Sequence, residues 1–477
     1  MEDERVFLYD LETAAGKSLY EKLTGCIRRD ILEGRLAAGA RLPSKRTAAA
    51  ALGVSVVTVT AAYEQLLAEG YLISRERRGY YVAQVEQWEL HPTPVARPAP
   101  PVLTSVESEE TDREPILDLV ENRIPAELFP LSVWERLTAR VWREQGQALL
   151  RRTDGQGLPS LRAAIRDSLY ESRGIRAEAE RILISAGNEQ LYALLLTLLG
   201  RDRVYGVEEP GYPLIARLYR ENGARVCPLP LDEGGVIPSE LYASGVQVLH
   251  ISPSHHFPTG TVTPVGRRQE LLSWLEGSPD RYIIEDDYDS EFRMAGRPIP
   301  SLQSMDRTGR VIYINTFTKT VAPSLRMGYA VLPAGICAAY RERLGFLSCP
   351  VAVSEQAVLA AFIADGSLTR HINRTRTRTR RVRDELIRAL AASPRASRYR
   401  VSAADGGLHF LLHVDTDLSD ESLCRALSDL GVRVRSLRDY FDRPPHTDTH
   451  TLVVGYAGLP PSSASELVYR LDAVVGK

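Results

Sequence analysis

The chain has 477 residues, of which 44% are hydrophobic and 25% are charged, and its formal net charge is −2. This length exceeds one ordinary domain, so we expect two or three. The five cysteines are scattered without CxxC spacing, and no apolar run approaches the ~20 residues that span a bilayer. The acidic start MEDERVFLYD lacks the apolar stretch of a signal peptide. Together these features favour a soluble cytoplasmic protein without membrane contact.

The N-terminal segment is basic, with 11 Lys and Arg against 6 Asp and Glu between Lys17 and Ala83. One apolar helix face is predicted by residues that recur every four positions, Leu19, Leu23, Ile27 and Ile31. Ser44 is expected to cap a short helix, and Ser55 to cap a second that runs to Gly70. Two short helices joined by a turn that contains glycine are typical of a helix-turn-helix. The following YLISRERRGYYV predicts two strands around a basic turn, a wing.

The run LPSKRTAAAALGVSVVTVTAAYEQLLAEGYL resembles the winged-helix pattern LPSxRxLAxxLGVSRxTVxxAYxxLxxEGYL of the GntR superfamily. The resemblance implies binding to double-stranded DNA, with the helix that begins after Ser55 in the major groove. Val56 stands where the family often has arginine, so base recognition is expected to shift toward thymine methyl groups and the wing. For the wing arginines the alternative is a solvated turn. The expected DNA contacts are Arg46, Ser55, Thr58, Thr60, Arg75, Arg77 and Arg78.

Residues 84–115 hold six prolines and seven acidic residues and have almost no aliphatic pattern. This composition predicts an extended linker that builds no core and reaches several tens of Å, at ~3 Å per residue. We therefore expect a winged helix-turn-helix at 13–83, a linker at 84–115 and an effector domain at 116–477.

In the effector domain, apolar runs of strand length alternate with helical patterns: RILIS, RVYGVE, VQVLHIS, RYIIED and RVIYINTF. Such alternation predicts an α/β fold with a parallel sheet covered on both faces. Ligands of these sheets bind at the carboxyl ends of the strands. The polar clusters that follow the strands are Gly187-Asn188, Glu209-Pro210-Gly211-Tyr212, His255-His256, Asp286-Asp287-Tyr288 and Thr318-Lys319.

The chemistry that fits these clusters is that of pyridoxal 5'-phosphate. Lys319 would form the aldimine, and Asp286 would hold the pyridine nitrogen protonated. Tyr288 is expected to hydrogen-bond the phenolic oxygen and Tyr212 to stack on the ring. The phosphate is expected to lie at a helix N-terminus and a polar loop, with Gly187, Asn188, Glu189, Thr316, Thr318 and Arg326.

The motifs SAGNEQLY, EEPGYP, SPSHHFPTG, IIEDDYDSEFR and TFTKTVAPSLRMGY, in this order, resemble fold type I aminotransferases and, more closely, the MocR/GabR family of bacterial regulators. The resemblance implies a large α/β domain with a mainly parallel sheet and a small C-terminal α+β domain. It also implies a domain-swapped, head-to-tail homodimer with the cofactor at the subunit interface.

Two departures from working aminotransferases favour a sensor over an enzyme. Phe257 stands where those enzymes have asparagine, and Val453 where they usually bind the substrate carboxylate with arginine. We therefore assign no catalytic residue. Relatives that sense γ-aminobutyrate use arginines at positions that resemble Leu214 and Val453, so that ligand is disfavoured. A nearby arginine among Arg433, Arg435 and Arg438 would substitute; the alternative is a solvated strand edge.

Other motifs are given simpler interpretations. His255 and His256 lack an acidic or cysteine partner at ligand spacing, so no metal is expected. The run RTRTRTRRVR is interpreted as a solvated, dimer-supporting helix rather than a nucleic-acid patch. The leading hypothesis is a DNA-binding regulator that senses a small amine or amino-acid-like effector, through an external aldimine, or senses pyridoxal phosphate itself. The alternative is an active aminotransferase with an accessory head.

Overall fold

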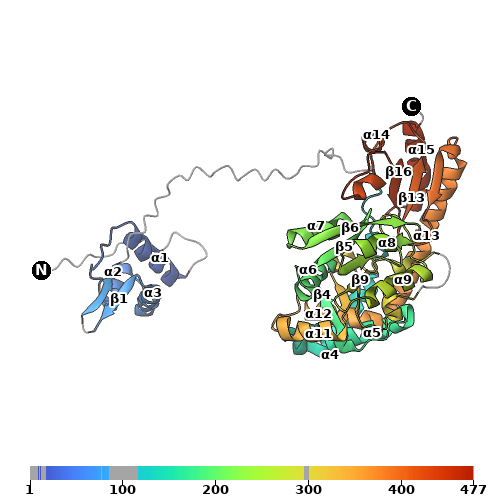
Figure 1. Cartoon of the computed structure of the whole chain (residues 1–477). Coiled ribbons are helices and arrows are strands. Elements are labelled where there is room, and N and C mark those ends of the chain that lie inside the picture. Colours follow the sequence, from blue (N-terminus) through green and yellow to red (C-terminus); the bar gives the residue numbers. More distant parts are fainter. Residues whose placement is uncertain are drawn as a thin grey trace. The chain divides into compact units, whose positions relative to one another are not determined.

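A computed structural model describes residues 9, 11, 18–76, 78–84, 116–294 and 300–475 of the chain. The chain divides into two units, Met1–Thr111 and Asp112–Lys477, and Figure 1 labels helices and strands of each. No single helix among the described residues is long and apolar enough to cross a membrane. The helix pair Lys45–Leu52 and Val56–Ala68 passes that test only jointly, and six of its side chains are buried in the core of the first unit.

The first unit is a winged helix-turn-helix, as predicted. Its elements are α1 (Leu19–Leu32), α2 (Lys45–Leu52), α3 (Val56–Ala68), β1 (Leu72–Arg75) and β2 (Gly79–Val82). The predicted caps are confirmed, because the Ser44 side chain accepts from the Thr47 amide and the Ser55 side chain from the Thr58 amide. The two strands pair antiparallel and form the predicted wing.

The second unit is built on an eight-stranded sheet of order β4-β11-β10-β9-β8-β5-β6-β7 (Figure 1). Its strands are β4 (Ile182–Ser185), β5 (Val204–Glu209), β6 (Arg225–Asp232), β7 (Gly235–Val236), β8 (Val248–Ile251), β9 (Tyr282–Asp286), β10 (Val311–Thr316) and β11 (Gly328–Val331). The five predicted strands are present, and pairing is parallel from β10 through β9, β8 and β5 to β6. The mainly parallel α/β fold is therefore confirmed. Strands β6, β7 and β11 were not predicted, and β11 and β7 pair antiparallel.

Helices cover both faces of this sheet. Ile182 and Tyr313 belong to one core with α4 (Leu131–Gln145), α5 (Pro159–Arg173) and α12 (Val353–Ala364). Leu183 and Ile312, which alternate with them along the strands, belong to the opposite core with α6 (Asn188–Leu199), α7 (Pro213–Glu221) and α11 (Ala334–Leu344). In a further core, side chains of α8 (Pro238–Ala243), α9 (Val265–Glu276) and α10 (Leu302–Met305) pack with side chains of β8 and β9.

The C-terminal part is a smaller α+β layer. A four-stranded sheet of order β12-β13-β16-β15 is made by β12 (Tyr399–Ser402), β13 (His409–Val414), β16 (Thr451–Gly455) and β15 (Arg435–Ser436). Its inner face packs on α13 (Ser367–Ala392), α14 (Asp420–Asp429) and α15 (Ala464–Val475), and β3 (Leu117–Asp118) pairs parallel with β14 (Val432–Arg433) beside it.

The arginine run lies on α13, and the expectation that its arginines are only solvated needs correction, whereas its dimer-supporting role stays a prediction. Arg376, Arg378 and Arg380 donate to the carbonyl oxygens of residues 291, 457 and 294. Arg383 donates in the same way to the carbonyl of Ala404. These contacts bind α13 to neighbouring loops, because guanidinium groups satisfy carbonyl oxygens that would otherwise lack donors.

Candidate cofactor-binding site

A cavity of about 470 Å³ lies at the carboxyl ends of the parallel strands. This volume falls within the usual range of small-molecule sites, about 300–1,000 Å³. Nine of the ten predicted cofactor residues line it: Asn188, Glu189, Tyr212, Asp286, Tyr288, Thr316, Thr318, Lys319 and Arg326. The tenth, Gly187, is outside the lining set and precedes α6, where a Cβ added to it would lie 3.2 Å from the Arg326 guanidinium.

Lys319 follows β10 and is held in a poorly solvated position. Its Nζ donates to the carbonyl oxygen of Asn122 at 2.8 Å. Burial lowers the pKa of this ammonium below its ordinary value, although the charge of Asp289 opposes the shift. A lowered pKa increases the fraction of neutral amine, which is the form that attacks a carbonyl carbon.

Asp286, at the end of β9, is surrounded by three side chains. The Tyr192 hydroxyl donates to Oδ2 at 2.5 Å, the Asn188 amide donates to Oδ1 at 3.3 Å, and the Nε2 of His250 lies 3.5 Å from Oδ2. Burial, together with the Asp286 charge, raises the pKa of Tyr192 well above its ordinary value, so the phenol keeps its proton and donates. The site therefore holds a buried carboxylate oriented by neutral donors.

His250 is oriented in turn by Tyr219. The Tyr219 hydroxyl lies 2.8 Å from Nδ1 of His250, and burial raises the pKa of this tyrosine well above its ordinary value. A phenol that keeps its proton donates to Nδ1, which leaves the His250 proton on Nε2, facing Asp286. Sequence reasoning missed Tyr192 and His250. The four-residue spacing from Asn188 to Tyr192, one helical turn, was the available signal for the first.

The polar end of the cavity combines a helix N-terminus with a strained arginine. Gly187 has φ 88° and precedes the first turn of α6, whose amides have no partner within the helix. Arg326 has φ 44°, an uncommon conformation for a non-glycine residue, and its guanidinium donates to Glu189 at 2.8 Å. The Thr316 hydroxyl donates to that of Thr318. Amides, hydroxyls and a guanidinium are the donors that bind phosphate.

A buried acid–imidazole pair lies in the wall of the cavity. The Glu208 carboxylate accepts from the Ser252 amide at 2.8 Å and lies 3.4 Å from Nε2 of His256. Burial raises the pKa of Glu208 to about 8 and lowers the pKa of His256 to about 3. Although the distance resembles an ion pair, both groups are mainly neutral at pH 7, because burial disfavours each charged form.

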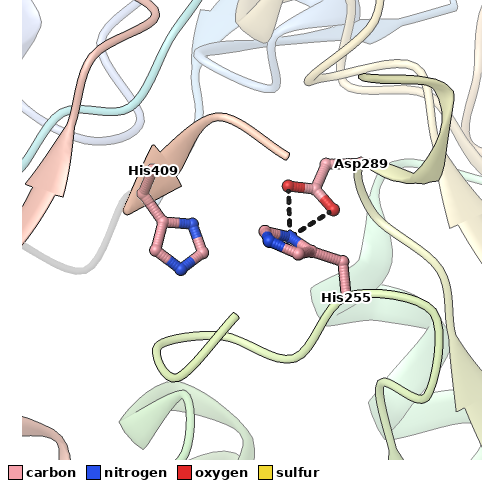
Figure 2. A group of neighbouring side chains, drawn as sticks. All are labelled: His255, Asp289 and His409. Atoms are coloured by element: carbon pink, nitrogen blue, oxygen red, sulfur yellow. Dashed lines mark hydrogen bonds and ion pairs between the residues drawn. The ribbon is translucent and has the colours of Figure 1, made fainter. Parts of the chain in front are cut away.

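His255, Asp289 and His409 converge beside the cavity (Figure 2). The Nδ1 of His255 donates to both oxygens of Asp289, at 3.1 and 3.0 Å. Nε2 of His409 donates to the Pro258 carbonyl at 3.0 Å, so Nδ1 of this neutral imidazole carries no proton and presents a lone pair. The sequence argument that His255 lacks an acidic partner is wrong, because tertiary structure supplies Asp289. The prediction that no metal binds here remains a prediction.

Another part of the cavity lining is aromatic and includes Arg435. The ring of Phe257 meets those of Tyr212, Tyr288 and Tyr440 edge-on, with centroids 6.1, 6.5 and 5.1 Å apart. Leu214 lines the cavity, and Val453 is buried in a small core with Tyr440. Of the three arginines considered as substitutes for the missing clamp, only Arg435 lines the cavity. Arg433 pairs with Asp118 and Arg438 with Asp448.

The predicted DNA contacts of the first unit are distributed over α2, α3 and the wing. Ser55, Arg46, Arg75 and Arg78 are exposed, and Thr58 and Thr60 are half-buried, whereas Arg77 lies outside the described residues. The guanidinium of Arg75 lies over the Tyr81 ring, 4.8 Å from its centroid. Val57, at the start of α3, is 77% exposed, which leaves an apolar surface where α3 would enter a groove.

Comparison with known proteins gives the same two parts. The family of bacterial regulatory proteins of the gntR type matches residues 19–82, and aminotransferase class I and II matches residues 114–470. The chain is 33% identical to the probable rhizopine catabolism regulatory protein MocR of Rhizobium meliloti, over 97% of this chain and 94% of the relative. It is 32% identical to the HTH-type pyridoxine biosynthesis transcriptional regulator PdxR of Corynebacterium glutamicum, over 89% of each.

Solved structures with a similar fold are aminotransferases. Kynurenine aminotransferase of Pyrococcus horikoshii has a TM-score of 0.67 at 21% identity, and covers 76% of this chain and 91% of the enzyme. LysN, the α-aminoadipate aminotransferase of Thermus thermophilus, has a TM-score of 0.64 at 25% identity, over 76% and 92%. The second unit therefore has the aminotransferase fold.

Proposed function

Because the chain belongs to the MocR/GabR family of HTH-type regulators with an aminotransferase-like domain, we propose that it is a bacterial transcriptional regulator that binds pyridoxal 5'-phosphate through Lys319. In this proposal it senses a small amine or amino-acid-like effector. The observation that carries it is one cavity lined by a half-buried lysine with a lowered pKa, a carboxylate held by neutral donors and a helix N-terminus with an arginine.

The residues fit this cofactor. A half-buried lysine with a lowered pKa suits covalent attachment, and Asp286 suits a protonated pyridine nitrogen. The buried Asn188 Oδ1 has no hydrogen-bond partner among the described residues, which is a place for a donor from a ligand. When bound, pyridoxal phosphate supplies a carbonyl carbon that condenses with amines and a ring that withdraws electrons.

Sensing rather than turnover is supported by the walls of the cavity. Phe257 contributes an apolar ring where an aminotransferase supplies an amide, and Val453 contributes no guanidinium. A bidentate arginine clamp positions the substrate carboxylate for reaction, so its absence from position 453 lowers the expected rate. The relatives named above are regulators, and the two names refer to different processes. The class of the effector is therefore inferred from the residues that line this chain's own cavity.

We propose that the protein acts in the cytoplasm, where it binds DNA as a domain-swapped, head-to-tail homodimer. The exposed Arg46, Arg75 and Arg78, together with the α3 N-terminus at Ser55, supply phosphate contacts. Val57 supplies an apolar surface for thymine methyl groups. Arg78→Ala should weaken binding on all sequences and reduce the salt slope by about one unit.

The proposal is tested by absorbance and by DNA retardation with one preparation. The purified chain incubated with pyridoxal phosphate should develop a visible band that resists dialysis, and Lys319→Ala should lack it. Retardation of the DNA upstream of its own gene should change when an effector is added to the wild type and not to Lys319→Ala. A colourless wild type with cofactor present would contradict the proposal.

Two outcomes would favour the alternatives. Steady turnover of an amino donor with a keto acid, without DNA retardation, would identify an aminotransferase with an accessory head. DNA affinity that responds to pyridoxal phosphate alone, and to no amine, would identify the cofactor itself as the effector. The first outcome lacks DNA retardation and the second requires it, so the two results exclude one another.

A further inference from the structure

We propose that Arg435 binds an oxyanion of the effector, which is therefore an amino acid or aminosulfonate rather than a simple amine. The inference rests on the proposed function, because it names the chemical class that the same cavity would take. Arg435 lines the cavity that also contains Lys319. A ligand whose amine lies at Lys319 and whose anionic group pairs with Arg435 carries opposite charges on these two groups.

Register places Arg435 beside the position of the missing clamp. In the small sheet, Arg435 of β15 pairs directly with Val453 of β16, and Val453 pairs with Leu411 of β13. Residues opposite one another in antiparallel strands project from the same face, with Cβ atoms about 5 Å apart. The three side chains therefore form one row, which ends in the guanidinium that reaches the cavity.

Arg435 is an exposed residue of the cavity lining, and the described part of the chain gives it no hydrogen bond or ion pair. Lys319 donates to Asn122, and Arg326 donates to Glu189. The acidic groups of the same wall are engaged elsewhere. Arg220 binds Asp442 through two hydrogen bonds of 2.5 and 2.6 Å, and Glu209 accepts from the Arg443 amide. Asp439 lies outside the cavity lining and accepts from the Ser436 amide, although the Arg435 charge opposes the rise that burial causes in its pKa.

The surroundings of Arg435 suit an anion that offers two oxygen atoms side by side. Its positive charge acts on the hydroxyls of Tyr212 and Tyr440, where it lowers pKa values that burial raises. Both tyrosines border the cavity together with Phe257. A guanidinium beside aromatic rings is weakly hydrated and presents a rigid fork, which matches the two oxygens of a carboxylate or sulfonate.

The test compares acids with their neutral amides on the cofactor-loaded protein. L-alanine, β-alanine, 4-aminobutyrate and taurine are titrated against the visible band of the bound cofactor, and the first three are compared with their carboxamides. At least one acid should act at a concentration well below its amide. In Arg435→Gln this acid should bind about 10- to 100-fold more weakly, as expected for a lost charge-assisted hydrogen bond, while the amide is unchanged.

Arg438→Gln is the matched control, because this arginine lies three residues away and pairs with Asp448 instead. It should leave both affinities unchanged, and Arg435→Lys should retain part of the preference because it keeps the charge without the fork. Equal responses to acid and amide, an equal loss of both in Arg435→Gln, or no response to any acid would overturn the inference. Failure of the proposed function is distinct, since the band itself would then be missing before any titration.

Discussion

The hydrogen bond from Tyr192 to Asp286 gives the sharpest test of how the site is built. Tyr192→Phe removes one oxygen atom and leaves the ring packed in the same core. The lost bond is the shorter of the two side-chain hydrogen bonds that Asp286 accepts, and both residues are buried. A hydrogen bond to a charged group contributes about 1.5–3 kcal/mol, so the free energy of unfolding of the cofactor-free protein should fall by that amount.

Cofactor affinity should respond differently from stability. Without the phenol, the Asp286 carboxylate loses a neutral donor and becomes a better partner for a protonated pyridine nitrogen. The dissociation constant of pyridoxal phosphate should therefore change by less than about threefold, which is well under 1 kcal/mol. Added cofactor should therefore stabilise the variant and the wild type by similar amounts, and the difference in stability between them should persist.

Urea unfolding followed by tryptophan fluorescence measures the first effect, since Trp134, Trp142 and Trp274 all lie in the second unit. Tyr219→Phe is the control, because that hydroxyl contacts the His250 imidazole and not the carboxylate. A bond between neutral groups contributes only about 0.5–1.5 kcal/mol. Equal losses in both variants, or no loss in Tyr192→Phe, would refute the assignment of Asp286 as a buried carboxylate held by Tyr192.

Three further predictions follow from the site and the head. Burial raises the pKa of Glu208 from 4.5 to about 8, so the unfolded chain releases this proton at lower pH than the folded protein does. The free energy of unfolding should therefore fall as pH rises from about 4.5 to 8, by at most about 1.4 kcal/mol per pH unit. Glu208→Gln should remove this slope in urea melts at graded pH. Gly187→Ala should lower the free energy of unfolding by roughly 1–3 kcal/mol and weaken cofactor binding, because φ is 88° and the added Cβ would lie 3.2 Å from the Arg326 guanidinium. Gly266→Ala, which has open space around it, is the control in the same melts. Ser55→Ala should lower the unfolding free energy of the head by about 0.5–2 kcal/mol, measured by circular dichroism, and Ser55→Asn should preserve it, since the side chain caps α3.

The sequence by itself determined the elements whose signals are local. The caps at Ser44 and Ser55, the wing, and the alternation of strands with helices are written in short-range patterns, and each is present. The residues expected to hold a cofactor were also foreseeable as a group. They follow strands that run in one direction, so their side chains meet at one edge of the sheet.

Only the tertiary structure decided which groups from distant segments face one another. The antiparallel β11 is four residues long and fully buried, so no alternation marked it. His250 reaches Asp286 from a neighbouring strand, and Asp289 reaches His255 across 34 residues. Arg435 lies beside Val453 only because two strands pair in that register. Periodicity reports which face a residue occupies within its own element, and contacts between elements depend on chain packing that no local pattern encodes.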